Sequence, residues 1–250
     1  MPSLVRRPRL VLAVVAAALV GAAAPANASV VTSARSFKPG FVEHIPKFGG
    51  DNVVPSTTTY SLAVAAGPGE ANAVVIELTA EGFVVRDAAG ATPGDGCTAA
   101  DATTVTCPTP PEPGTAIVYR GVTRVTLEDG DDTLTVPPRS PTFFRLPEVD
   151  GGSGDDVITG AGKAMGGPGD DRLDADTADG GSGDDRITAR DAEGGDGRDT
   201  LAPNGGTTPV TLRGGAGDDV LTGGPASTSA AAGDVLDGGE GDDRLIGGSW

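Results

Sequence analysis

A nine-residue pattern that recurs six times in the second half of the chain constrains its fold more than any other feature. The pattern is G-G-x-G-x-D-x-U-x, where U is a large aliphatic residue. Its six copies begin at Gly151, Gly166, Gly180, Gly194, Gly214 and Gly238. A seventh copy at 127–135 keeps the end of the pattern but lacks the paired glycines. Repetition of this kind predicts stacked structural units, each of which completes the core of its neighbours.

The composition of the same region would by itself predict a solvated, disordered segment. Residues 150–250 hold 27 of the 40 Gly and 21 of the 35 acids, but only 13 Val, Leu, Ile or Phe. So few bulky apolar residues exclude a large conventional core. Stacked repeats need only one inward aliphatic residue each, at the U position, and these residues would form a thin ladder. The ladder would consist of Ile158, Leu173, Ile187, Leu201, Leu221 and Leu245.

The residue types in the pattern indicate a metal site. Three Gly within six positions allow backbone conformations that other residues avoid, so that carbonyl groups can turn inward in a tight loop. Aspartate oxygens and converging carbonyls are the hard ligands that Ca²⁺ prefers. The turns therefore predict that the chain binds calcium ions.

These motifs resemble the haemolysin-type calcium-binding repeat, the RTX family, closely over residues 151–246 and partially over 127–135. The resemblance implies an all-β fold, a right-handed parallel β-roll, with calcium between successive turns along one edge. Carried over by position, it implies side-chain ligands at Asp156, Asp171, Asp185, Asp199, Asp219 and Asp243, and at Asp132 in the partial copy. The adjacent acids are expected to face outward or to lie behind the ligands: Asp155, Asp170, Asp184, Asp218 and Asp242. Arg198 stands at this fifth position in the fourth copy and is expected to weaken its site.

The spacing of the copies distinguishes the two edges of such a roll. A regular array returns to the same edge after two nonapeptides, about 18 residues, whereas these copies start 15, 14, 14, 20 and 24 residues apart. Because the glycine-rich turn keeps its length, the variation must fall on the opposite edge. We therefore expect one calcium-lined edge and one irregular, metal-poor edge, with up to five ions between the six full turns.

The first residues indicate export. Arg6, Arg7 and Arg9 precede an apolar run at Leu10–Val20 and a small-residue cleavage signal at Ala26-Asn27-Ala28, the order of a secretory signal peptide. The alternative is a membrane anchor, but the run is shorter than the roughly 20 residues that a membrane-spanning helix needs. We expect residues 1–28 to be removed, which leaves no membrane span and a net charge of −20 from 15 bases and 35 acids.

Two cysteines, Cys97 and Cys107, lie close together in a chain that is expected to leave the cytosol. A disulfide is the expected state in that compartment. Closing so short a loop would stabilise the fold by about 2.5–3 kcal/mol in the chain-entropy model. Two free thiols are the alternative.

The chain is expected to contain four segments: a signal peptide at 1–28, a poorly defined stretch at 29–72, a β-rich cap at 73–149 and the roll at 150–250. The cap would contain the disulfide and the partial repeat and would continue into the roll. Apolar runs between turn residues predict its strands at Ala73–Leu78, Gly82–Asp87, Thr103–Cys107, Ala116–Arg120, Val122–Leu127 and Thr133–Val136.

Charge and motifs limit the classes of function. A net charge of −17 argues against nucleic acid and against anionic lipid as partners. His44 is the only histidine and stands outside an H-E-x-x-H motif, and no G-x-S-x-G or P-loop sequence occurs, so we expect no enzymatic activity. The expected function is that of a secreted, extracellular calcium-binding protein that folds on binding Ca²⁺ and has a structural or surface role. The alternative is an accessory or truncated part of a larger secreted enzyme or adhesin.

Overall fold

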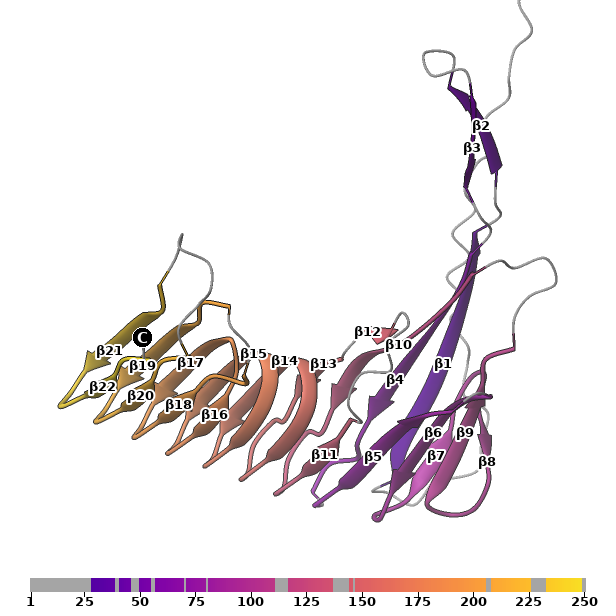
Figure 1. Cartoon of the computed structure of the whole chain (residues 1–250). Helices are drawn as coiled ribbons and strands as arrows, with labels where there is room; N and C mark the ends of the chain where they lie inside the picture. The colour runs from indigo at the N-terminus through magenta and orange to yellow at the C-terminus, as the bar shows by residue number, and fades with distance from the viewer. Residues whose placement is uncertain are drawn as a thin grey trace, which may run out of the picture.

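The protein folds as a stack of parallel β-coils closed at one end by antiparallel strands (Figure 1). The computed structural model describes residues 28–38, 41–45, 50–54, 57–69, 71–79, 81–110, 117–136, 144–145, 147–205, 208–225 and 233–248. Every regular element among them is a strand. The all-β fold and the parallel stack expected from the repeats are confirmed. The expected signal peptide lies outside these residues, apart from Ala28.

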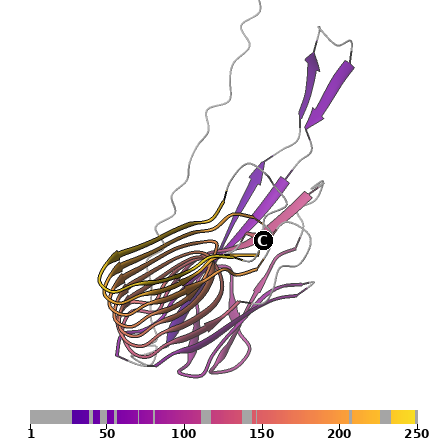
Figure 2. The same ribbon diagram turned by 60° about the vertical axis from the view of Figure 1, so that its left-hand side comes forward.

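Two parallel ladders form the body of the roll, and each coil contributes one strand to each ladder (Figure 2). The ladder that carries the U residues contains β5 (Ala73–Leu78), β11 (Thr133–Thr135), the start of β14 (Val157–Pro168), the start of β15 (Arg172–Ser182), β16 (Arg186–Thr188), β18 (Thr200–Ala202), β20 (Val220–Thr222) and β22 (Arg244–Ile246). The facing ladder contains β4 (Thr57–Ala65), β10 (Ile117–Thr126), β13 (Glu148–Asp150), the ends of β14 and β15, β17 (Asp191–Asp196), β19 (Thr211–Ala216) and β21 (Val235–Glu240). Both ladders continue from the strands before residue 150 to those after it without a break. The change in composition at residue 150 therefore occurs within a single stack of strands.

Antiparallel strands cover the N-terminal end of both ladders. β1 (Ser29–Lys38) pairs with β4, and β6 (Gly82–Asp87) pairs with β5. The remaining cap strands are β7 (Ala91–Pro93) beside β1, β9 (Thr104–Pro108) beside β6, and β8 (Thr98–Ala99) beside β9. The short strand β12 (Phe144–Arg145) pairs with β10, while β2 (Phe41–Ile45) and β3 (Gly50–Val54) form a separate hairpin. Pairing of both end strands satisfies backbone groups that an open ladder would expose.

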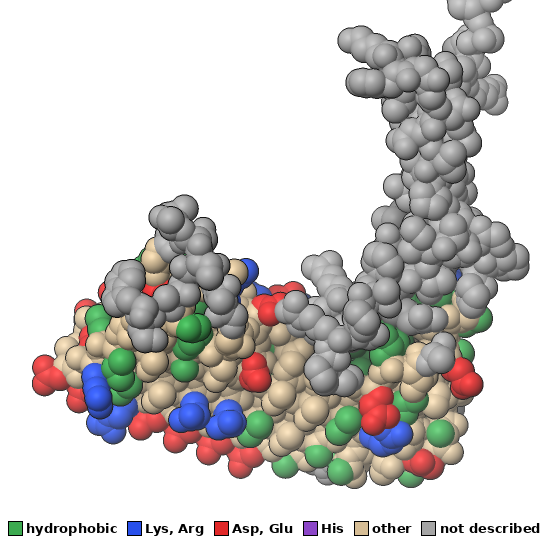
Figure 3. Space-filling view, viewed as in Figure 1, with side chains coloured by type: hydrophobic (Ala, Val, Ile, Leu, Met, Phe, Trp, Pro, Cys, Tyr) green, Lys and Arg blue, Asp and Glu red, His purple; other side chains and the backbone are tan. Residues whose placement is uncertain are grey.

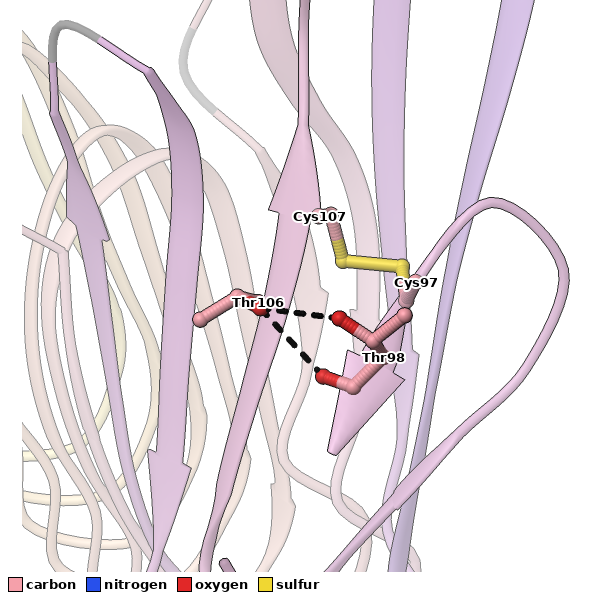
Figure 4. The surroundings of a disulfide bond; sticks show 4 residues. All are labelled: Cys97, Thr98, Thr106 and Cys107. Carbon is pink, nitrogen blue, oxygen red and sulfur yellow. Dashed lines mark hydrogen bonds between the residues drawn. A yellow bond between two sulfur atoms is a disulfide. The ribbon is translucent and has the colours of Figure 1, made fainter. Parts of the chain in front are cut away.

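The expected disulfide is present and joins two neighbouring segments of the cap (Figure 4). Cys97 and Cys107 are bonded, and the next residues in register, Thr98 and Thr106, pair in the β8–β9 ladder. Their hydroxyl oxygens lie 3.1 Å apart, within hydrogen-bonding distance. Cys107 is buried in the core cluster. The bond therefore fixes the segment that leads into β8 against β9 and the interior of the cap.

The predicted cap strands lie close to where the sequence placed them. β5 and β6 have the expected bounds, and β9 and β11 differ by a residue at their ends. The two strands expected at Ala116–Arg120 and Val122–Leu127 are one continuous strand, β10, in which Gly121 pairs in register with Ser61. Glycine did not end the strand because Gly121 pairs with Ser61 of β4 on one side and with Arg145 of β12 on the other.

The roll core has two unequal rows of buried side chains. Ile158, Leu173, Ile187, Leu201 and Leu221 in the U ladder are all fully buried. The facing ladder has small residues in the shortest coils, where Ala164, Ala178 and Ala192 follow one another in register. Leucine replaces alanine in this row at Leu212 and Leu236, where the coils are longer. A short coil encloses less space, so a large side chain on one face requires a small one on the other.

Leu245 lies in the expected ladder opposite Leu221, but 49% of its surface is exposed, unlike the other U residues. It belongs to β22, on whose outer side no described residue packs.

The Leu173→Ala and Leu245→Ala variants are therefore a matched pair that compares a buried with an exposed U residue. In saturating calcium, Leu173→Ala should lower the free energy of unfolding by about 2–5 kcal/mol, and Leu245→Ala by clearly less. Urea unfolding followed by circular dichroism measures both, and equal losses would contradict this description of the core.

Candidate metal centre

All six glycine-rich turns lie along one edge of the roll, stacked in register. The second glycines of the last five copies pair along the facing ladder: Gly167, Gly181, Gly195, Gly215 and Gly239. Each has φ between +104° and +122°, a region that favours glycine. The equivalent position in the partial copy is Glu128, at φ 76°. The partial copy therefore adopts the turn conformation despite lacking its paired glycines.

The sixth-position aspartates form a buried column along this edge. The backbone N–H of Asp156 donates to Asp171 Oδ1 at 2.8 Å, and the N–H of Asp171 donates to Asp185 Oδ1 at 2.8 Å. The same bond, at 2.8–3.0 Å, connects Asp132 to Asp156, Asp185 to Asp199, Asp199 to Asp219 and Asp219 to Asp243. Each carboxylate thus reaches back to the preceding coil with one oxygen.

The second oxygen of these carboxylates is buried and has no hydrogen-bond partner. This holds for Oδ2 of Asp132, Asp156, Asp171, Asp185, Asp199 and Asp219, whose residues are at most 2% exposed. A buried carboxylate oxygen without a donor is strongly unfavourable unless a cation compensates it. The repetition of the same unpaired atom in successive coils indicates a repeated cation site.

The first glycine of each turn shows what surrounds that oxygen. A Cβ atom added at Gly166 would lie under 3.0 Å from both Asp171 Oδ2 and the carbonyl oxygen of Gly180 in the next coil. The same two groups converge at Gly151, Gly180, Gly194 and Gly214. A carboxylate oxygen from one coil and a carbonyl oxygen from the next therefore lie close together in five gaps, with no side chain between them. This donor set is the type that Ca²⁺ prefers.

The two ends of the column differ from its middle. At Gly238 only Asp243 contributes, since no described coil follows to supply a carbonyl oxygen. At the other end Leu127 occupies the first position, where any Cβ in the full turns would crowd the carboxylate. Asp132 Oδ1 instead accepts bonds from the backbone and side-chain nitrogens of Asn72, at 2.6 and 3.2 Å. Asp132 and Asp243 thus belong to the column but lack the complete donor set of the other five.

The fifth-position acids form a second, exposed row that bonds in the opposite direction along the stack. The N–H of Asp170 donates to Asp155 Oδ1, and the N–H of Asp184 to Asp170 Oδ1, at 2.8 and 2.7 Å. The backbone N–H of Arg198 donates to Asp184 Oδ1. Arg198 has no carboxylate that could accept an N–H bond from Asp218, so this row is interrupted there. The inner bond from Asp199 to Asp219 is kept in the same gap. Figure 3 shows acidic and basic side chains side by side along the lower margin of the roll.

The opposite edge has no comparable column in the described residues. Its shortest connections pack as buried alanines, Ala161, Ala175 and Ala189. One acid there, Asp234, was not expected from the sequence; its two oxygens accept N–H bonds from Val210 and Gly224 at 3.1 and 2.8 Å. The segment Asp234-Val235-Leu236, which repeats the D-x-U spacing, could have revealed it. Because both oxygens already have donors, Asp234 is not equivalent to the inner column.

Burial changes the acidity of the column. It raises the pKa of Asp171 and Asp185 from 3.8 to about 7, and the negative charges of neighbouring aspartates add to this effect. Burial likewise raises the pKa of Asp132, Asp156 and Asp199 to about 6, and raises that of Asp219. A bound cation would favour the charged carboxylates, so protons and metal compete for the same oxygens.

Conventional clusters of metal-binding side chains are absent from the described part of the chain: no three His, Cys, Asp or Glu residues converge. Each gap instead combines one buried carboxylate oxygen with a backbone carbonyl oxygen.

The sequence model of the RTX calcium-binding nonapeptide repeat matches this chain in four copies, over residues 148–162, 193–226 and 231–249. The chain carries RTX calcium-binding nonapeptide repeats. They indicate calcium binding, and the oxygen-only donors of the turns fit Ca²⁺.

Other comparisons add no further relative. No curated protein and no solved structure matches the chain. Within the described residues, no helix has the length and hydrophobicity needed to cross a membrane.

The inner and outer aspartates of one turn provide a matched test of the site. Asp185→Asn keeps Oδ1 as acceptor for Asp171 but replaces the unpaired Oδ2 with an N–H donor. We expect this variant to weaken calcium binding in its gap by at least about ten-fold, measured by isothermal titration. Asp184→Asn, which changes an exposed acid in the same turn, should alter affinity by less than about three-fold. Equal effects would contradict the assignment of the inner row to the metal.

The raised pKa values predict the pH dependence of the calcium-free chain. The folded roll then holds more protons than the unfolded chain between about pH 4 and 7, so its free energy of unfolding falls as pH rises. In chelator, far-UV circular dichroism should show more β structure at about pH 5.5 than at pH 7.5. The calcium concentration needed to saturate the folded roll should rise as pH falls below about 7, because protons compete with Ca²⁺ for the same oxygens. A calcium-free chain that gains β structure with increasing pH would contradict this sign.

Proposed function

We propose that this is a secreted, non-enzymatic calcium-binding protein whose roll folds when Ca²⁺ binds, and that it has a structural or surface role outside the cell. The observation that carries the proposal is the column of buried carboxylate oxygens without donors. In each of five gaps such an oxygen lies beside a glycine carbonyl of the next coil.

The residues that would hold calcium are the aspartates of the five complete gaps: Asp156, Asp171, Asp185, Asp199 and Asp219. Asp132 and Asp243, at the ends, are proposed as partial sites. When bound, the ion supplies positive charge between coils and neutralises carboxylates that would otherwise repel one another. The chain itself supplies the backbone N–H bonds that orient each carboxylate and the glycines that leave room beside it.

Folding and binding should be coupled because the roll has little else to stabilise it. Apolar burial in the repeats comes from one narrow ladder, a facing row of alanine and leucine, and a few small residues at the opposite edge. Several buried, like-charged carboxylates oppose this small gain in the absence of metal. Calcium binding sites in extracellular modules typically have dissociation constants of about 10⁻⁴–10⁻³ M, so such a roll would stay unfolded in the cytosol and fold outside the cell.

An extracellular role is supported by the disulfide and by the arginine-rich, apolar start of the sequence. The absence of an enzymatic role is proposed because the turns account for the paired aspartates and for the serines beside glycine. His44 lies in β2, whose side chains are outside the described set. Calcium ions are the proposed partners, and nucleic acid is not among them.

Circular dichroism of the chain from residue 29 to 250 tests the coupling. In chelator at neutral pH we expect loss of much of the β signal, and in millimolar calcium we expect its recovery. Equilibrium dialysis should count about five bound ions per chain. Magnesium at the same concentration is the control and should be much less effective, because it demands a tighter octahedral site. A β-rich spectrum that does not change between chelator and calcium would contradict coupled folding.

A further inference from the structure

A buried polar site in the cap lies at the residue that signal cleavage would make the first of the chain. Ser29 begins β1 and is fully buried. Its hydroxyl donates to Asp87 Oδ2 at 2.5 Å, and its backbone nitrogen donates to the carbonyl oxygen of Gly90 at 3.0 Å. The cleavage signal Ala26-Asn27-Ala28 ends immediately before this serine.

Asp87 is a fully buried carboxylate with only neutral donors around it. Besides Ser29, it accepts N–H bonds from Ala73 at 3.2 Å and from Ala89 at 3.1 Å. No described Lys or Arg forms an ion pair with it. A buried negative charge of this kind is costly unless a positive group compensates it. The site therefore has the acceptor of an ion pair and lacks the cation.

We propose that the free α-ammonium group of Ser29, created by hydrolysis of the Ala28–Ser29 peptide bond during export, pairs with Asp87 and completes the cap. Water adds across the amide, so Ala28 leaves with a carboxylate and Ser29 retains a protonated amine. The inference rests on the secretion proposed above, because it requires removal of the leader.

The geometry places the new charge close to its partner. Three covalent bonds join the Ser29 nitrogen to its own Oγ, so this nitrogen lies within roughly 6 Å of Asp87 Oδ2. Opposite charges at such distances attract each other strongly when they lie away from water. The ammonium group has three N–H bonds in place of one, so it can keep the bond to Gly90 while its positive charge attracts the Asp87 carboxylate. Ala28 packs closely against Gly90, and its removal provides the space.

The site also lies beside the start of the calcium column. Ala73, which donates to Asp87, follows Asn72, and Asn72 donates to Asp132, the first aspartate of the column. β1 and β6, which carry Ser29 and Asp87, are the strands that close the two ladders. An ion pair here would strengthen the cap only in the processed chain, so the leader-bearing chain would fold less stably before export.

A double-mutant cycle on the full mature chain tests the pair. Chains that begin at Ser29 are compared with a free amine and after Nα-acetylation by an acetyltransferase that accepts Ser. In saturating calcium, acetylation should raise the unfolding equilibrium constant at least about ten-fold, measured by urea unfolding. In Asp87→Asn the effect of acetylation should fall below about two-fold, whereas in the control Asp95→Asn, an exposed acid of the same cap, it should remain.

Two outcomes would overturn the proposal: an acetylation effect below two-fold in the unsubstituted chain, or the same effect with and without Asp87. If Asp87→Asn does not fold, the pairing is tested in the unsubstituted chain by the rate of reductive methylation of the Ser29 amine. Ser29 must then react at least about ten-fold more slowly in folded than in unfolded protein, and equal rates overturn the pairing. Intact mass of the exported protein must place Ser29 first. Calcium titration of both chains is separate: its loss in both would reject the proposed function, while normal binding without an acetylation effect rejects only the ion pair.

Discussion

The roll depends on the electrostatics of its buried aspartate column. Each carboxylate uses one oxygen to bond the preceding coil and leaves the other buried without a donor. The first interaction sets the coils in register, while the second opposes folding until a cation is present. Register and metal dependence therefore arise from the same side chain, which explains why a chain with so little apolar burial can still adopt one defined stack.

The rest of the structure accommodates this column. Glycine at the first position leaves space between coils, and glycine at the second permits the positive φ of the turn. Alanine opposite the U residues lets the coils contract to a length at which the opposite edge has no room for a second glycine-rich turn. At the N-terminal end, β1 and β6 cover the open ladders, and the disulfide fixes the loop beside them. The protein thus concentrates its metal-binding chemistry on one edge and its apolar packing in the narrow interior.

The sequence predicted much of this arrangement because the repeat encodes it locally. The turns and the U ladder followed from residue types at fixed spacings, and the bounds of β5 and β6 followed from apolar runs between turn residues. The alanine row was missed because alanine is common in every environment, and only the facing strands show that it is buried. Asn72 and Asp87 were missed because no repeat marks them. Their roles arise from β5, β6 and β11, which are distant in sequence and adjacent in the sheet.

By itself, the sequence determined the conformation of each turn, the chemical type of its oxygen ligands and the edge on which the turns recur. These properties depend on nearby residues, since glycine sets the backbone and aspartate supplies the carboxylate. The tertiary structure decided which carboxylate oxygens have no hydrogen-bond donor and in which gaps an aspartate lies beside a carbonyl of the next coil. It also decided how the two ends of the column, at Leu127 and at the last described coil, differ from its middle. Burial and pairing are properties of the neighbouring coil, and a single repeat does not contain them.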